Sequence, residues 1–176
     1  SAFGGFKEPY GVATSRDRSF ALVADCGSGR VGRIDLATGE VQFPYTGFSD
    51  PRGVAIAPSG SFALVVNWGG NNVARIDLDN GGVEFPFGGF NGPYDVAISS
   101  DGTFALVAYC YGRNLGRIDL DAGTVEFLAP GLAGPVGVAI TPDARFALAT
   151  EKLSGALCRV DLATQVVTRL PFKLTR

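Results

Sequence analysis

The strongest constraint on this chain is a repeat of 42 residues that runs through it without insertion or deletion. The copies open on prolines that stand 42 residues apart, at Pro9, Pro51, Pro93 and Pro135. An Arg-x-Asp triplet follows the same step, at Arg33/Asp35, Arg75/Asp77, Arg117/Asp119 and Arg159/Asp161. A fixed period marks one structural unit that is repeated in space. The four copies must therefore share one fold and be placed by one recurring step.

The second copy contains four short strands. Residues 53–57 and 61–67 are apolar runs separated by a Pro-Ser-Gly turn, and residues 72–78 alternate between two faces. Residues 79–82, Asp-Asn-Gly-Gly, form a hairpin turn because such residues tolerate positive φ. Residues 83–87 supply the fourth run. No stretch has helical periodicity of comparable length, which predicts an all-β unit.

The second run of each copy has no solvent side. Phe62 to Val66 are all apolar, and a strand of that kind must be covered on both faces. Neighbouring copies must therefore stack face to face, as the blades of a β-propeller do. A flat two-sheet sandwich is the alternative, but it gives no reason for a constant step. We predict a single all-β propeller domain over residues 1–176, with four-stranded blades at about 9–50, 51–92, 93–134 and 135–176.

Two motifs resemble the NHL and YVTN families of propeller repeats. They are Pro51-x-Gly-Val-Ala-Ile-x-Pro-x-Gly and the stretch from Val65 to Val73. The resemblance implies the fold but not one function, because such blades serve many kinds of protein. These families usually close with six or seven blades, whereas this chain has four copies. A tight four-bladed ring, an eight-bladed ring shared by two chains, and a segment of a larger propeller all stay open.

The ends of the chain bear on closure and compartment. Val166 to Leu174 would supply the fourth copy with its own last strand, so no terminus needs to lend a strand to another blade. Ser1 and Ala2 would fit the remainder of a cleaved signal peptide. That reading favours an extracellular location, although the sequence does not decide the compartment.

Composition excludes several classes of function. A net charge of −2 argues against nucleic acid as a partner, and no apolar run is long enough for a membrane span. The chain has no histidine, which removes the commonest general base and metal ligand. Three cysteines do not make a disulfide framework, and we expect free thiols. On these grounds we expect no cofactor, no metal site, no catalytic residue and no enzymatic activity.

The repeated Arg-x-Asp triplets predict structural ion pairs. Residues two apart on a strand point the same way, so each Arg and its Asp could pair on one face. A function seldom needs one pair four times, which favours a structural ladder.

The copies differ most at one rim of the predicted propeller, where the loops before the first strand and after the second strand meet. A uniform scaffold with one variable, aromatic-rich rim is typical of a recognition surface. The candidate binding residues are Tyr10, Arg52, Trp68, Tyr94, Asp95, Tyr109 and Tyr111. Asp95 stands where the other copies have glycine, and it could also cap its own backbone.

The sequence therefore favours a structural or interaction module that contacts a protein partner, or another copy of itself, through this rim. A carbohydrate-binding propeller is the first alternative, because exposed aromatic rings stack on sugars. The second is a hydrolase resembling the calcium-dependent propeller lactonases and esterases. Its calcium would be held by oxygen atoms of Asp25, Asn67, Glu151 and Asp95.

Overall fold

The computed structural model describes residues 4–171 and consists of four antiparallel four-stranded sheets. We call the sheets blades 1 to 4. Blade 1 contains β1 (Pro9–Thr14), β2 (Phe20–Asp25), β3 (Arg30–Asp35) and β4 (Val41–Thr46), with a short 3-10 turn, η1 (Cys26–Ser28). Blade 2 contains β5 (Pro51–Ile56), β6 (Phe62–Asn67), β7 (Asn72–Asp77) and β8 (Val83–Phe87). Blade 3 contains β9 (Pro93–Ile98), β10 (Phe104–Tyr109), β11 (Leu115–Asp119) and β12 (Thr124–Leu128). Blade 4 contains β13 (Pro135–Ile140), β14 (Phe146–Glu151), β15 (Leu157–Asp161) and β16 (Val167–Arg169).

The all-β prediction and the four strands per copy are confirmed. In each blade the strands lie in chain order, joined by tight turns. The last strand, β16, is shorter than the predicted run, and residues 172–174 of that run lie outside the described part of the chain. No helix within residues 4–171 is long and apolar enough to cross a membrane.

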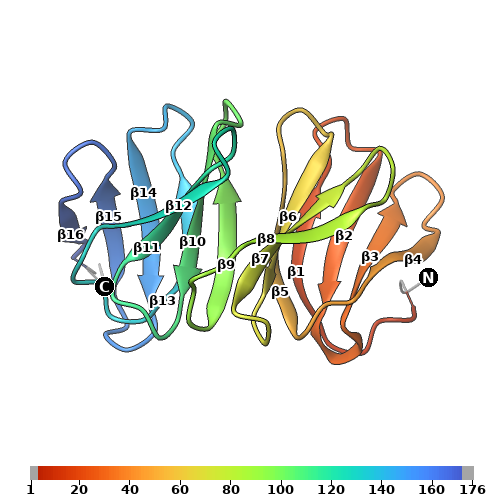
Figure 1. Ribbon diagram of the computed structural model, residues 1–176, viewed down its shortest axis with the longest axis horizontal. Helices are drawn as coiled ribbons and strands as arrows, with labels where there is room; N and C mark the ends of the chain where they lie inside the picture. Colours follow the sequence, from red (N-terminus) through yellow and green to blue (C-terminus); the bar gives the residue numbers. More distant parts are fainter. Residues whose placement is uncertain (1–3, 172–176) are drawn as a thin grey trace, which may run out of the picture.

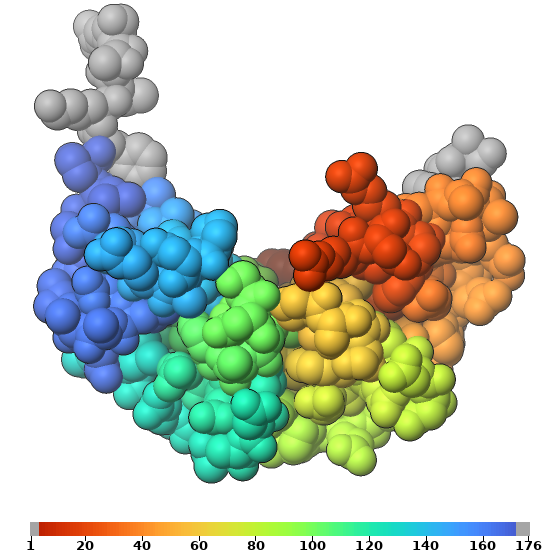
Figure 2. Space-filling model, turned by 90° about the horizontal axis from the view of Figure 1, so that it is seen from above, coloured from red at the N-terminus to blue at the C-terminus, as the bar shows by residue number. Residues whose placement is uncertain are grey.

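The blades stand side by side along an arc (Figure 1). First strands of neighbouring blades contact each other, β1 with β5, β5 with β9 and β9 with β13, so they line the inner side. Figure 2 shows a crescent in which blade 1, in red and orange, and blade 4, in blue, stay apart. The described chain therefore forms an open arc and not a tight four-bladed ring.

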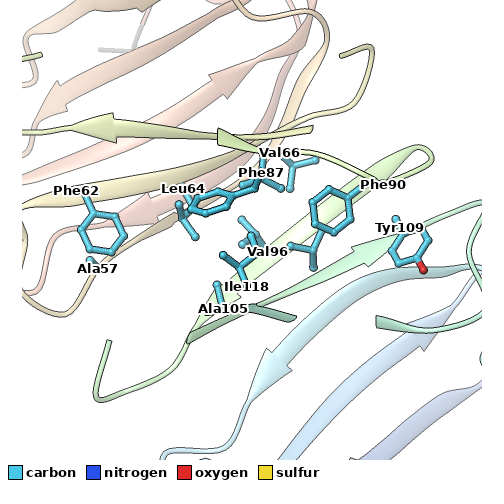
Figure 3. Packing of buried hydrophobic residues seen from close by; sticks show 12 residues of the cluster. Ala57, Phe62, Leu64, Val66, Phe87, Phe90, Val96, Ala105, Tyr109 and Ile118 are labelled. Atoms are coloured by element: carbon cyan, nitrogen blue, oxygen red, sulfur yellow. The ribbon is translucent and has the colours of Figure 1, made fainter. Parts of the chain in front are cut away.

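Packing between blades accounts for the two-sided apolar strands. Phe62, Leu64 and Val66 of β6 point toward blade 3, where Val96 and Ile118 receive them (Figure 3). The alternate residues of β6 point the other way and pack on blade 1. Every residue of β2, β6 and β10 is buried. Burial of such apolar surface, at roughly 25 cal/mol per Å², is the main stabilising term of this fold.

The loop that leads into each blade places an apolar side chain, here called an anchor, on the face of that blade that points toward the preceding blade. The anchors are repeat-equivalent residues, namely Phe6, Phe48, Phe90 and Leu132. The Phe90 ring lies so close to Gly116 that a Cβ there would come within 2.4 Å of it, and a Cβ on Gly32 would come within 2.6 Å of the Phe6 ring. A small residue on the third strand of blades 1 and 3 thus makes room for an aromatic ring from the preceding loop.

The predicted Arg-x-Asp ion pairs are corrected by the structure. The Arg33 guanidinium lies 3.5 Å from the centroid of the Phe20 ring, and Arg75 lies 3.9 Å from that of Phe62. The Asp35 carboxylate instead accepts hydrogen bonds from backbone N–H groups two and three residues ahead, in the following turn. Arg117 and Arg159 also stack on phenylalanines, and Asp77, Asp119 and Asp161 also cap their turns.

Each Asp binds the turn and not its Arg because the N–H groups of the turn are nearest to it along the chain. Each Asp ends its strand, so donors of the adjoining turn are already in place, whereas the Arg side chain is long enough to lie across a neighbouring ring. In the described residues, Arg117 is the one triplet arginine with an ion pair, to Glu126 at 2.9 Å.

We predict that Leu64→Ala and Leu106→Ala each lower the free energy of unfolding by about 2–5 kcal/mol, because each leaves a cavity between two blades. Urea unfolding monitored by circular dichroism measures this. Val166→Ala is the control, since Val166 is exposed. A cost below about 0.5 kcal/mol for Leu64→Ala would contradict the sandwiched position of β6.

Candidate functional site

One rim of the arc carries the variable loops, as predicted. Pro9 pairs with Asp25, Asp25 with Arg30, and Arg30 with Thr46, so the start of β1 and the ends of β2 and β4 lie at the same end of the sheet. The same register recurs in blade 2, where Pro51 pairs with Asn67. Loops before first strands and after second strands therefore share this rim.

Arg52 is the centre of an aromatic cluster drawn from three blades. Its guanidinium carbon lies 4.3 Å from the ring centroid of Trp68 in blade 2 and 4.5 Å from that of Tyr94 in blade 3. Tyr10 of blade 1 lies 5.3 Å away. Such cation–π contacts contribute about 0.5–2 kcal/mol each, more when water is excluded. Four of the predicted rim residues are thus brought together.

Tyr10 and Tyr94 join blades 1 and 3 across the inner side of blade 2. Their rings meet edge to face with centroids 5.6 Å apart, and their hydroxyl groups are hydrogen-bonded. That hydrogen bond, with some burial, raises the pKa of Tyr10 to about 12. The Tyr10 phenol is therefore neutral at physiological pH.

Asp50 balances the charge of Arg52. Its carboxylate lies 3.2 Å from the guanidinium, and both side chains are largely buried. Asp50 has φ of 57°, in the left-handed region, where the equivalent Gly92 and Gly134 also lie. Cys26 donates a hydrogen bond to the same carboxylate, and burial followed by that bond raises the pKa of its thiol to about 12. Asp50 was not among the residues predicted from the sequence. It could have been noticed because it stands where two other copies have a glycine.

In blades 1, 2 and 4, the residue at the end of the second strand ties down the loop that enters its own blade. Asp25 accepts the N–H groups of Lys7 at 3.0 Å and Glu8 at 2.8 Å. At the equivalent position, Asn67 accepts the N–H of Ser49 at 2.6 Å, and Glu151 accepts that of Ala133 at 2.9 Å. We call Asp25, Asn67 and Glu151 the loop-capping residues.

Within residues 4–171 the structure does not bring the expected calcium ligands together. Their oxygens are engaged with backbone N–H groups in separate blades, and residues 4–171 contain no group of three or more acidic, Cys or His side chains arranged to hold a metal. Burial opposes ionisation of Asp25, but bonds from Ser28, Glu8 and Lys7 hold its pKa below the usual value. For Glu151, bonds from Ser154, Ala133 and Arg169 likewise outweigh burial and lower the pKa.

Asp95 lies between blades and does not face the open rim. One carboxylate oxygen accepts the N–H of Val96 at 2.9 Å, and the other accepts that of Val138 in blade 4 at 3.0 Å. Burial raises the pKa of Asp95, against the effect of both hydrogen bonds. Asp95 thus caps its own backbone, the alternative noted from sequence, and also joins blade 3 to blade 4.

Tyr109 and Tyr111 have different surroundings, although they were predicted to serve one surface. Tyr109 is buried, packs on Phe90 and Phe127, and donates a hydrogen bond to Asn114. Its placement on the open rim was therefore wrong, because its ring fills the space between blades 2 and 3. Tyr111 is 65% exposed.

Tyr111 borders a groove of about 540 Å³ between the loops of blades 3 and 4. Its apolar lining includes Leu132, Cys110 and Leu153, of which Leu153 is 76% exposed. Arg113 and Lys152 also line it, and among the described residues neither forms an ion pair. The groove can therefore accept an apolar side chain with negative charge beside it.

All three cysteines are free thiols, as expected. Cys110 lies in the groove wall, and Cys158 is buried beneath Leu132 in the interface of blades 3 and 4. Burial, followed by a hydrogen bond to Glu151, raises the pKa of Cys158 to about 11.

No protein-family model and no curated protein matches the sequence. Solved structures match it in fold. A hydrazine synthase of Kuenenia stuttgartiensis superposes with a TM-score of 0.82 at 21% identity, over 95% of this chain and 50% of that one. A virginiamycin B lyase from Staphylococcus aureus gives 0.76 at 20%, over 93% and 55%. A chain of a nidogen/laminin complex gives 0.83 at 14%, over 93% and 63%. The fold is a β-propeller.

These propeller neighbours correct one expectation. The absence of histidine led us to expect no enzymatic activity, yet several similar structures are virginiamycin B or streptogramin B lyases. The fold is shared by enzymes and by a protein solved in a complex with another protein. The chain spans only 50% to 63% of the lengths of the three propellers compared above, so their activities belong to larger structures.

We predict that Asp25→Asn lowers the free energy of unfolding by about 1 kcal/mol at pH 7, since an amide oxygen accepts the two N–H bonds less strongly than a carboxylate. The folded pKa of Asp25 is lowered, so its stabilisation is present above the unfolded pKa of about 3.9 and is lost as pH falls through the folded value. The difference between the two proteins should therefore shrink in acid.

Urea unfolding at a series of pH values measures this difference. Asp79→Asn is the control for net charge, because Asp79 is exposed. A gap between wild type and Asp25→Asn that stays constant down to acid pH would contradict the role of the Asp25 carboxylate.

Proposed function

We propose that the protein is a binding propeller whose rim recognises a protein partner. The observation that carries this proposal is the groove beside Tyr111, where exposed apolar side chains lie next to Arg113 and Lys152. An isolated apolar patch with unpaired cations is typical of a recognition surface. The partner chemistry it fits is an aliphatic or aromatic side chain flanked by carboxylates.

The aromatic cluster around Arg52 would extend this surface. Tyr10 is half-exposed, and Tyr and Arg are enriched among residues that dominate binding energy. Because Asp50 already pairs with Arg52, this cluster offers rings and hydroxyl groups and little free charge. Aromatic rings alone could stack on a sugar. The apolar groove beside Tyr111 instead fits an apolar side chain, which favours protein over carbohydrate as the ligand.

We predict that peptides selected on this protein from a displayed random library carry acidic residues beside an apolar one. Tyr111→Ala and Leu153→Ala should each weaken binding of a selected peptide by more than about 1 kcal/mol, as truncation of a contact residue does. Lys152→Glu should weaken the binding of acidic peptides more than these Ala substitutions do. Isothermal calorimetry provides the affinities.

Val166→Ala is the matched control, because it removes an exposed apolar side chain away from the rim. Selected peptides that bind all three groove variants as tightly as they bind the wild type would refute the proposal. Binding of sugars that changes the fluorescence of Trp68, with no peptide selected, would favour the carbohydrate alternative.

A further inference from the structure

Each interface between blades joins two different faces. The leading face of a blade carries Phe and Leu of its second strand and meets the next blade; the trailing face carries the alternate residues and meets the preceding blade. Three such interfaces lie within residues 4–171. Blade 1 keeps an open trailing face, and blade 4 keeps an open leading face (Figure 2).

The trailing face of blade 1 exposes residues that are packed elsewhere. Val12 is 67% exposed, whereas the equivalent Val54 and Val96 are 7% and 4% exposed. Leu36 is 42% exposed, whereas the equivalent Leu78 packs against the core shared by blades 1 and 2. This face is therefore built as an interface and lacks its partner.

The leading face of blade 4 shows the complementary half. Phe146 and Leu148 are only partly buried. Their equivalents in the other blades are buried, namely Phe20, Phe62 and Phe104, and Leu22, Leu64 and Leu106. In the inner interfaces these phenylalanines and leucines receive the residues equivalent to Val12 and Leu36.

The anchor of the missing interface is already supplied. Phe6 covers Val23, Ala21 and Ile34 of blade 1, as Phe48 and Phe90 do in the next blades. The open trailing face thus lacks a blade beside it but not its loop anchor.

We propose that a second copy of this chain covers both open faces, with blade 4 of each copy packed on blade 1 of the other. The contact repeats the inner interfaces, so the two copies would close a ring of eight blades, four from each. Head-to-tail contacts of this kind close when the rotation between copies fits a ring. The chain covers 50% to 63% of the three propeller chains compared above, so each of them is longer than four blades of this length.

Two departures from the repeat fall on these faces. Thr14 replaces the isoleucine found at Ile56, Ile98 and Ile140, and the exposed Thr150 replaces a buried apolar residue, found as Ala24, Val66 and Ala108. Each substitution places a polar side chain where the inner interfaces bury an apolar one, and so removes apolar surface from the contact. The contact between chains is therefore weaker than the contacts within a chain.

The test is the mass in solution, measured by light scattering and by sedimentation velocity across a wide range of protein concentration. We expect a species of twice the 18.3 kDa chain mass. Val12→Asp should raise its dissociation constant by about tenfold or more, because a buried carboxylate would be unpaired. Val166→Asp should not, since its equivalents Glu40, Gly82 and Thr124 are exposed even in blades 1 to 3. Unchanged circular dichroism shows that Val12→Asp leaves the fold intact.

A mixture tests the head-to-tail arrangement. Leu148→Asp blocks the leading face, and Val12→Asp blocks the trailing face, so the two variants together still offer one intact contact. They should form a heterodimer at protein concentrations at which each variant alone is monomeric. The double variant Thr14→Ile/Thr150→Val should form a tighter dimer than the wild type does.

Three results would overturn the proposal. One is a chain that stays monomeric at all concentrations, which would leave the open faces to further blades of a longer chain. The second is a dimer that Val12→Asp leaves unchanged, which would place the contact elsewhere, such as the rim. The third is open-ended polymers, which would show that the ring does not close. None depends on peptide binding by the groove.

Discussion

The burial of one strand from both sides is the constraint on which this structure depends. Strands β2, β6 and β10 are apolar on both faces, so a single sheet cannot shield them and each blade needs a neighbour. The constant 42-residue step follows, because every interface reuses one pair of faces. The same constraint leaves the arc with two faces that the described chain does not cover.

The sequence was sufficient for the architecture because the information is periodic. Strand positions, turn residues and the shared rim could be predicted from one copy and checked against three others. Side-chain partners could not. Tyr109 was assigned to the open rim, but its ring packs on Phe90 and Phe127, whereas Asp25, Asn67 and Glu151 at the equivalent position each hold a loop. Asp35 was assigned to Arg33, but nearby turn N–H groups compete better for its carboxylate.

The departures between copies had three different causes, which look alike in sequence. Asp25, Asn67 and Glu151 vary in identity but share one task, capping the incoming loop. Asp95 replaces a glycine in order to bridge blades 3 and 4. Residues such as Tyr111 and Leu153 differ and also stay exposed. Only burial and hydrogen bonding distinguish these exposed residues from the capping and bridging ones. The candidate surface could therefore be identified only from the structure.

The two surfaces of this protein follow from different parts of the blade. The rim lies at strand ends, where loops can change without disturbing the packed faces, and so it can diversify for recognition. The open faces are made of the strands themselves, whose residues are fixed by the need to stack. A ring completed by stacking would place two identical rims on one side, related by the ring axis. Two copies of the groove beside Tyr111 would then face a partner together, which raises avidity without any new contact.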